Sequence, residues 1–179
     1  MNHVLRFRHL IILVAYLVLA LTLTYPLVTQ FADHVPGTTT WSMDEYGYVW
    51  NNWWFKHAVF DLGTNPFQTN YLFYPIGTSL VLYAFTLLHV LLGLPIQFAF
   101  GLIPASNAEL LFGFVFSAYG TFLLTHYVLR FTLSRDRMDS ASLNLAAFIA
   151  AALFAFSSNR FVYASHGHYN IVAPAWLPF

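Results

Sequence analysis

The stretch LIILVAYLVLALTLTYPLVT, residues 10–29, decides the fold class. It contains no charged residue, and as a helix it is long enough to cross a bilayer core of about 30 Å. Arg6 and Arg8 precede it, and basic residues tend to stay on the cytoplasmic side of a first span. A cleaved signal peptide is the alternative, but its apolar core usually has about 7–15 residues and ends at a small-residue cleavage site. We therefore expect an uncleaved anchor with a cytoplasmic N-terminus.

The composition excludes most other protein classes. Of the 179 residues, 59% are hydrophobic and 8% are charged, whereas a soluble domain has about 25% charged residues. Disorder is excluded because it requires low hydrophobicity and high charge. The seven basic residues are balanced by seven acidic ones, so no nucleic-acid partner is expected. Without cysteine, disulfides and thiolate chemistry are also excluded. We expect an all-α, polytopic membrane protein.

Further apolar runs predict more membrane spans. Residues 107–129 and 143–160 are expected to cross the bilayer, and an outer segment, 161–170, leads into the start of another span near 171–179. Half a helix in lipid leaves backbone groups unsatisfied. We therefore expect residues 1–179 to be one transmembrane module at the N-terminus of a longer chain.

Residues 30–78 are predicted to form a large outer loop. They contain five of the fourteen charged residues and four of the five tryptophans, which favours a position at the lipid headgroups. Within the loop, Ser42 and Glu45 have the spacing of a helix capping box. This predicts an amphipathic helix that runs to about Phe60.

The topology depends on residues 79–103, an apolar run broken at 93–95. If this run spans the membrane, Arg130, Arg135 and Arg137 lie outside. If it is a pair of edge helices that turns at 93–95, these arginines lie inside, as the positive-inside rule favours. We expect the edge helices.

The order of these features resembles the GT-C superfamily of polytopic glycosyltransferases, and in particular bacterial members of uncharacterised specificity. The resemblance rests on organisation and on six short segments: Thr24-Tyr-Pro-Leu, Met43-Asp-Glu-Tyr46, Asn65-Pro-Phe, Tyr74-Pro-Ile-Gly77, Ser165-His-Gly-His-Tyr-Asn170, and Ala173-Pro-Ala-Trp-Leu-Pro178. It implies transfer of a sugar from a polyprenyl-phosphate-linked donor to an acceptor at the outer face of a bacterial plasma membrane. The implied partners are the lipid bilayer and the lipid-linked donor.

Asp44 and Glu45 are the candidate catalytic residues. The resemblance implies that an acidic residue in the outer loop accepts a proton from the acceptor hydroxyl. Adjacent helix positions point about 100° apart, so at most one of the two is expected to face a site. The alternative is that both acids stabilise the first turn of a helix through its dipole.

The candidate substrate-binding residues share hydrogen-bond donors that suit a phosphate: Lys56, Arg160, His166, His168 and Asn170. The alternatives are snorkelling to headgroups for the two cations, and a polar turn for the other three. In the resembling enzymes this second outer segment carries acidic residues that bind a metal or the acceptor. Here it carries histidines, and Zn²⁺ normally takes at least three protein ligands, so we assign no metal site. A divalent cation stays an alternative.

Two other functions compete with catalysis. The chain can be a non-catalytic scaffold or partner subunit that retains the first spans of the fold, with the rest of the chain or another subunit covering its exposed faces. It can also be a transporter subunit, although transporters tend to place ionisable groups at mid-membrane and the acids here lie in the loop.

Overall fold

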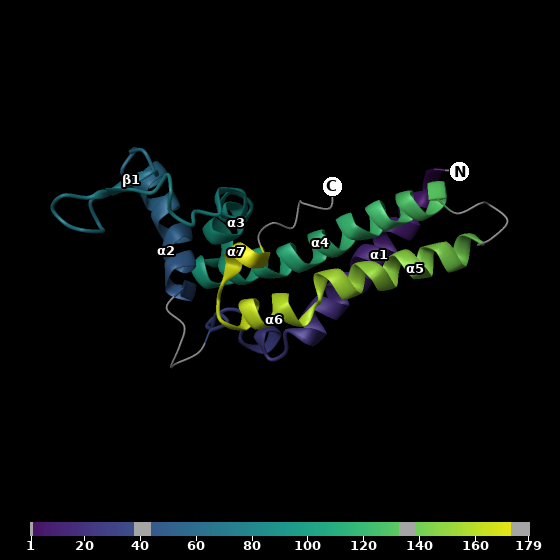
Figure 1. Cartoon of the computed structure of the whole chain (residues 1–179). Helices are drawn as coiled ribbons and strands as arrows, with labels where there is room; N and C mark the ends of the chain where they lie inside the picture. The colour runs from purple at the N-terminus through teal and green to yellow at the C-terminus, as the bar shows by residue number, and fades with distance from the viewer. Residues whose placement is uncertain (1, 38–43, 133–138, 173–179) are drawn as a thin grey trace.

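The computed structural model describes residues 2–37, 44–132 and 139–172, with the side chains of 2–6, 170 and 171 left aside. The chain is mostly helical, which confirms the helical class (Figure 1). The described elements are α1 (Asn2–Leu23), the 3₁₀ turn η1 (Leu27–Gln30), α2 (Asp44–Lys56), the π-helical turn η2 (His57–Asp61), β1 (Gln68–Thr69), β2 (Thr78–Ser79), α3 (Leu87–Phe100), α4 (Leu102–Thr132), α5 (Ser140–Ala155), α6 (Ser158–Ser165) and α7 (Tyr169–Val172).

Three long helices, α1, α4 and α5, lie side by side and make the molecule elongated (Figure 1). Tyr16 of α1 stacks on Phe148 of α5 with ring centroids 4.6 Å apart, and its hydroxyl donates to the Phe148 carbonyl. Ala147, Ala151 and Ala155 are fully buried against α4 and α1. Small residues at four-residue spacing let helices approach closely, so this stripe is a packing face.

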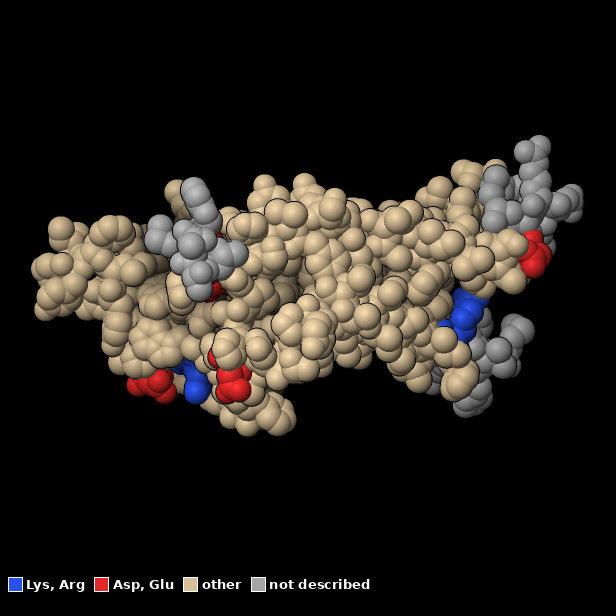
Figure 2. Space-filling model, turned by 90° about the horizontal axis from the view of Figure 1, so that it is seen from below, with Lys and Arg blue, Asp and Glu red and all other residues tan. Residues whose placement is uncertain are grey.

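The outer surface of this bundle is apolar. Helix α4 and the stretch Ser140–Ser165 are each long and apolar enough to cross a membrane. Large apolar side chains such as Val18, Leu145 and Leu153 are exposed on the three helices. On the face seen in Figure 2, charged side chains lie at the two ends of the molecule and leave the middle uncharged. Exposed apolar surface of this kind marks a lipid or protein contact.

The first helix is shorter than the sequence predicts. It ends at Leu23, and residues 24–30 form turns and η1 instead of continuing the helix to residue 29. The cause is Pro26, which lacks a backbone N–H and disfavours helical geometry at Tyr25. Its apolar part is Phe7–Leu23.

The predicted span 143–160 crosses a helix break. Helix α5 ends at Ala155, and α6 begins at Ser158 after Ser157 takes an extended conformation. Serine commonly precedes a helix, so the Ser157-Ser158-Asn159 sequence restarts the helix here. Helix α4 is longer than the predicted 107–129, because Pro104 fits within a first helical turn.

Residues 79–103 contain one helix where the sequence predicts two. No turn occurs at residues 93–95, and α3 continues through Pro95 to Phe100. The chain turns at Gly101, whose φ of 100° favours glycine. With 14 residues α3 is about 21 Å long, shorter than a bilayer core. The start of α1, the end of α4 and the start of α5 consequently lie at the same end of the bundle (Figure 1).

Candidate active site

Helix α2 presents the two predicted acids at its first turn. It begins at Asp44, and Asp44 and Glu45 complement the helix dipole there. The predicted capping residue Ser42 lies outside the described residues. The helix and the π-helical turn that follows it end at Asp61, close to the predicted end at Phe60.

The structure brings Asp44 and His168 together. Asp44 Oδ2 lies 3.1 Å from His168 Nδ1, and the Asp44 and His168 side chains are 56% and 33% exposed. Neutral His168 donates its Nδ1–H to the carboxylate, and protonated His168 forms an ion pair with it. The contact joins the acidic segment at the start of α2 to the histidine segment that follows α6.

Two glycines allow this contact by enclosing Glu45. A Cβ on Gly167 would meet Glu45 Cβ and would lie 2.9 Å from Glu45 Cα, and Gly167 has a φ of 72°. On the other side, a Cβ on Gly37 would lie 2.8 Å from Glu45 Oε1. Glu45 is therefore only 3% exposed, while Asp44 faces solvent. The two acids point in different directions, as expected for neighbours on a helix.

A cavity of about 340 Å³ lies next to this contact. Its walls are mostly apolar and come from residues 23–27, 34–37 and the helices α4 and α6, with Gln30 and Ser165 among the few polar groups. The volume is in the range of small-molecule sites, about 300–1,000 Å³. The segment Thr24-Tyr-Pro-Leu thus lines a cavity whose wall includes Gly37, which contacts Glu45.

Two predicted substrate ligands have partners other than Asp44. Lys56 is twelve residues further along α2, about 18 Å away, and its Nζ lies 4.9 Å from the centre of the Phe98 ring. Arg160 is 9% exposed, and its Nη2 donates to the carbonyl of Val172 at 3.2 Å. Arg160 therefore holds α7 to α6. A phosphate-binding role for either cation stays a prediction.

The other histidine of the segment caps a helix. His166 Nδ1 lies 2.7 Å from the carbonyl of Val162, and its ring centroid is 6.5 Å from that of His168. The side chain of Asn170 lies outside the described residues. Within the described part of the chain, no three His, Cys, Asp or Glu side chains gather as metal ligands.

A buried polar cluster behind Asp44 is absent from the sequence prediction. Asn52 Nδ2 donates to Ser106 Oγ at 3.0 Å and to Glu109 Oε2 at 2.9 Å. A carboxylate near the start of an apolar run is a candidate functional group, but the sequence alone indicates an interfacial position for Glu109 and not a buried one. Glu109 is 5% exposed because α2 and α3 cover the start of α4.

The same cluster contains His89 and Tyr169. With Glu109 they line a cavity of about 10 Å³, close to the space that one water molecule needs. Burial lowers the pKa of His89, which favours its neutral form. Burial, together with the charges of Glu109 and Glu45, raises the pKa of the Tyr169 hydroxyl. The Tyr169 ring stacks on Tyr48 of α2, with centroids 5.6 Å apart, and so links the cluster to the helix that carries Asp44.

No family model, curated protein or solved structure matches this chain.

Proposed function

We propose that this chain forms a glycosyltransferase module of the GT-C kind in a bacterial plasma membrane. It transfers a sugar from a polyprenyl-phosphate-linked donor to an acceptor at the outer face, and its N-terminus is cytoplasmic. The contact between Asp44 and His168 carries the proposal, because it joins the two segments in which the resemblance places site residues.

The proposed reaction is a displacement at the anomeric carbon of the donor sugar. The acceptor hydroxyl oxygen forms the new bond, and the bond to the phosphate oxygen breaks, so polyprenyl phosphate leaves with the electron pair. Asp44 takes the hydroxyl proton, a role that contributes typically about 10²- to 10⁴-fold in rate. Its half-exposed carboxylate is accessible to an acceptor, and His168 orients it.

The donor is proposed to occupy the apolar cavity beside the contact. That cavity reaches from the end of α1 to Ser165, whose hydroxyl donates to the carbonyl of Val162 at 2.8 Å. Its mostly apolar walls suit the lipid part of the donor.

The membrane placement is proposed from the surface of the bundle. Helix α4 and the stretch Ser140–Ser165 have the length and composition of spans. On the face seen in Figure 2, the charged side chains of the described residues lie toward the two ends of the molecule. The arginines at the end opposite Asp44 belong on the cytoplasmic side under the positive-inside rule.

The alternative is a non-catalytic subunit, and the packing of Glu45 favours it. Gly37 and Gly167 enclose Glu45, so the contacts around Asp44 also hold the α6–α7 segment to α2. A purely structural role predicts that removing the charge of Asp44 leaves the cellular function intact.

The test is sugar transfer in proteoliposomes that contain the purified chain. Polyprenyl-phosphate-linked hexoses and pentoses are offered as donors together with neutral oligosaccharides as acceptors, and the release of polyprenyl phosphate is measured. The Asp44→Asn variant should lose at least about 100-fold in rate, while the control Asp33→Asn, an exposed acid of the same loop, should keep it. Equal rates for the wild type and the Asp44→Asn variant, or no release from any donor, would overturn the proposal.

A further inference from the structure

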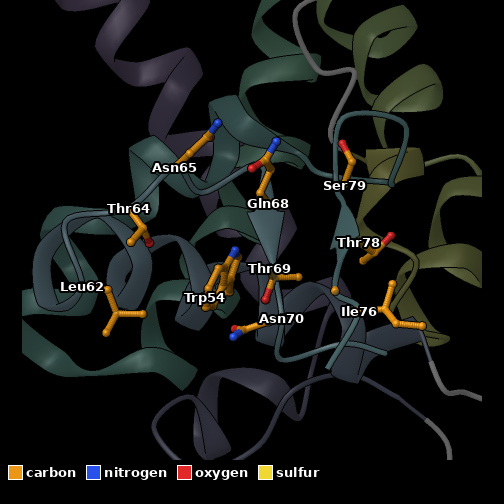
Figure 3. Close-up of a pocket in the computed structure, with 11 residues that line it drawn as sticks. Trp54, Leu62, Thr64, Asn65, Gln68, Thr69, Asn70, Ile76, Thr78 and Ser79 are labelled. Atoms are coloured by element: carbon orange, nitrogen blue, oxygen red, sulfur yellow. The ribbon is translucent and has the colours of Figure 1, made fainter. Parts of the chain in front are cut away.

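A second cavity, of about 710 Å³, lies beyond the other end of α2 from Asp44 (Figure 3). The end of α2, the segment after η2 and the β1–β2 pair form its walls. It opens to solvent, and its volume lies within the range of ligand sites. Neither the site around Asp44 nor the proposed donor cavity shares a lining residue with it.

The walls of this cavity combine apolar surface, from residues such as Leu62 and Ile76, with uncharged polar groups. Carboxamides come from Asn65, Gln68 and Asn70, and hydroxyls come from serine and threonine residues that include Thr78. No Asp, Glu, Lys or Arg is among the described residues that line it. The acidic residue next to the wall, Asp61, is engaged by His57 at 2.8 Å.

Several of these polar groups are available to a ligand. Among the described residues, the side chains of Gln68, Asn70 and Thr78 make no hydrogen bond, and Gln68 and Asn70 are exposed. Figure 3 shows the side chains of Asn65 and Gln68 extending to the same side of the strand pair. The side-chain carbonyl oxygen of Asn65 accepts a hydrogen bond from the backbone N–H of Phe67 at 2.9 Å, which leaves the side-chain NH₂ group of Asn65 to donate.

The cavity is held in shape before any ligand binds. The indole N–H of Trp54 donates to the carbonyl of Pro66 at 2.9 Å, and Leu80 N donates to Phe67 O at 2.8 Å. Gly77 has a φ of 74°, and a Cβ there would lie 2.7 Å from the carbonyl of Thr69, so only glycine lets the strands close here. A preformed site loses less entropy on binding.

This chemistry selects a class of ligand. A charged ligand finds no counter-ion here, and an apolar ligand leaves the carboxamides without partners. A neutral sugar suits the walls because each of its hydroxyls donates and accepts, and each carboxamide offers both functions side by side. We propose that this cavity binds a neutral saccharide.

The position of the cavity assigns a role to that saccharide, and this step rests on the proposed function. Trp54, in the cavity wall, lies ten residues along α2 from Asp44, about 15 Å away. A single sugar ring does not span this distance. The cavity therefore holds a part of an oligosaccharide acceptor that is remote from the reacting hydroxyl.

Binding is tested on the purified chain in nanodiscs, without donor. The probes are immobilised neutral hexose and pentose oligosaccharides and matched uronic-acid oligosaccharides. We expect binding of neutral probes that weakens roughly tenfold in the double variant Gln68→Ala, Asn70→Ala, which removes two neutral hydrogen-bonding groups. The control Leu82→Ala changes a 98% exposed side chain of the same loop that does not line the cavity, and it should bind like the wild type.

The inference is overturned if no neutral probe binds, if uronic-acid probes bind equally well, or if the double variant binds like the wild type. Thermal unfolding of the double variant, expected to match that of the wild type because both side chains are exposed, shows that its fold is intact. Saccharide binding without any sugar transfer would refute the proposed function but not the assignment of this cavity as a saccharide site. If sugar is transferred and the double variant binds saccharide like the wild type, only the assignment of the cavity is refuted.

Discussion

Asp44 Oδ2 and His168 Nδ1 lie 3.1 Å apart, although one residue opens α2 and the other follows α6. The contact depends on Gly167, since its backbone lies directly against Glu45. The Asp44 carboxylate thus contacts His168 beside the packed pair Glu45 and Gly167, and substitutions can test these residues separately.

His168 and His166 should have unequal roles. Removing His168 by the change His168→Ala deletes a charge-assisted contact, worth about 1.5–3 kcal/mol, and should slow sugar transfer about 10- to 100-fold. His166 bonds to Val162 instead of Asp44, so His166→Ala should change the rate little. The measurement is the dependence of the initial rate in proteoliposomes on donor concentration. A positioning role for His168 predicts a lower kcat with an unchanged KM in its variant, whereas a similar loss in both variants would argue against it.

The fold should require glycine at position 167 for two reasons: a side chain there would clash with Glu45, and the backbone φ is positive. Gly167→Ala places a Cβ against Glu45 and should cost about 1–3 kcal/mol of unfolding free energy beyond the backbone strain. Gly63 also has a positive φ, of 62°, but open space around it, so Gly63→Ala should cost only the strain, about 1–2 kcal/mol. Thermal unfolding in detergent compares the two, and equal losses would mean that the contact with Glu45 adds nothing.

Gly93 and Glu109 should be energetically coupled. A Cβ on Gly93 would meet Glu109 Oε1 and lie 2.8 Å from Glu109 Cδ, so Gly93→Ala should destabilise the packing of α3 on α4. Shortening the acid in Glu109→Ala removes that clash and also the hydrogen bond from Asn52. A double-mutant cycle by chemical unfolding should give a coupling of about 0.5–3 kcal/mol. Strict additivity would show that the two side chains do not share this space.

The topology can be mapped with single cysteines because the chain has none of its own. Asp61 and Thr132 are exposed and lie toward opposite ends of the molecule. Asp61→Cys should react with an impermeant maleimide on intact spheroplasts, and Thr132→Cys should react only after permeabilisation. Labelling of both from the same side would exclude the proposed orientation.

Much of the helical architecture follows from sequence alone. Apolar runs of spanning length can bury their backbone polar groups only as helices, so residues 107–129 and the alanine stripe of α5 were predictable. The acid-rich start of α2 is likewise a local signal, since carboxylates at that position stabilise a helix start. The ends of the helices were less predictable, because Pro26 and Ser157 end or restart a helix inside apolar runs that hydropathy joins together.

The arrangement of the site was decided by tertiary packing. Sequence singled out Asp44 and His168 separately, but their contact depends on α5 running back along α4, so that the segment after α6 reaches α2 (Figure 1). No local feature of the sequence predicts the burial of Glu109 and Arg160, because a charged residue is buried only when other helices pack over it. Hydropathy and helix propensity act between neighbours in the chain, whereas these contacts join residues that only the packed helices bring together.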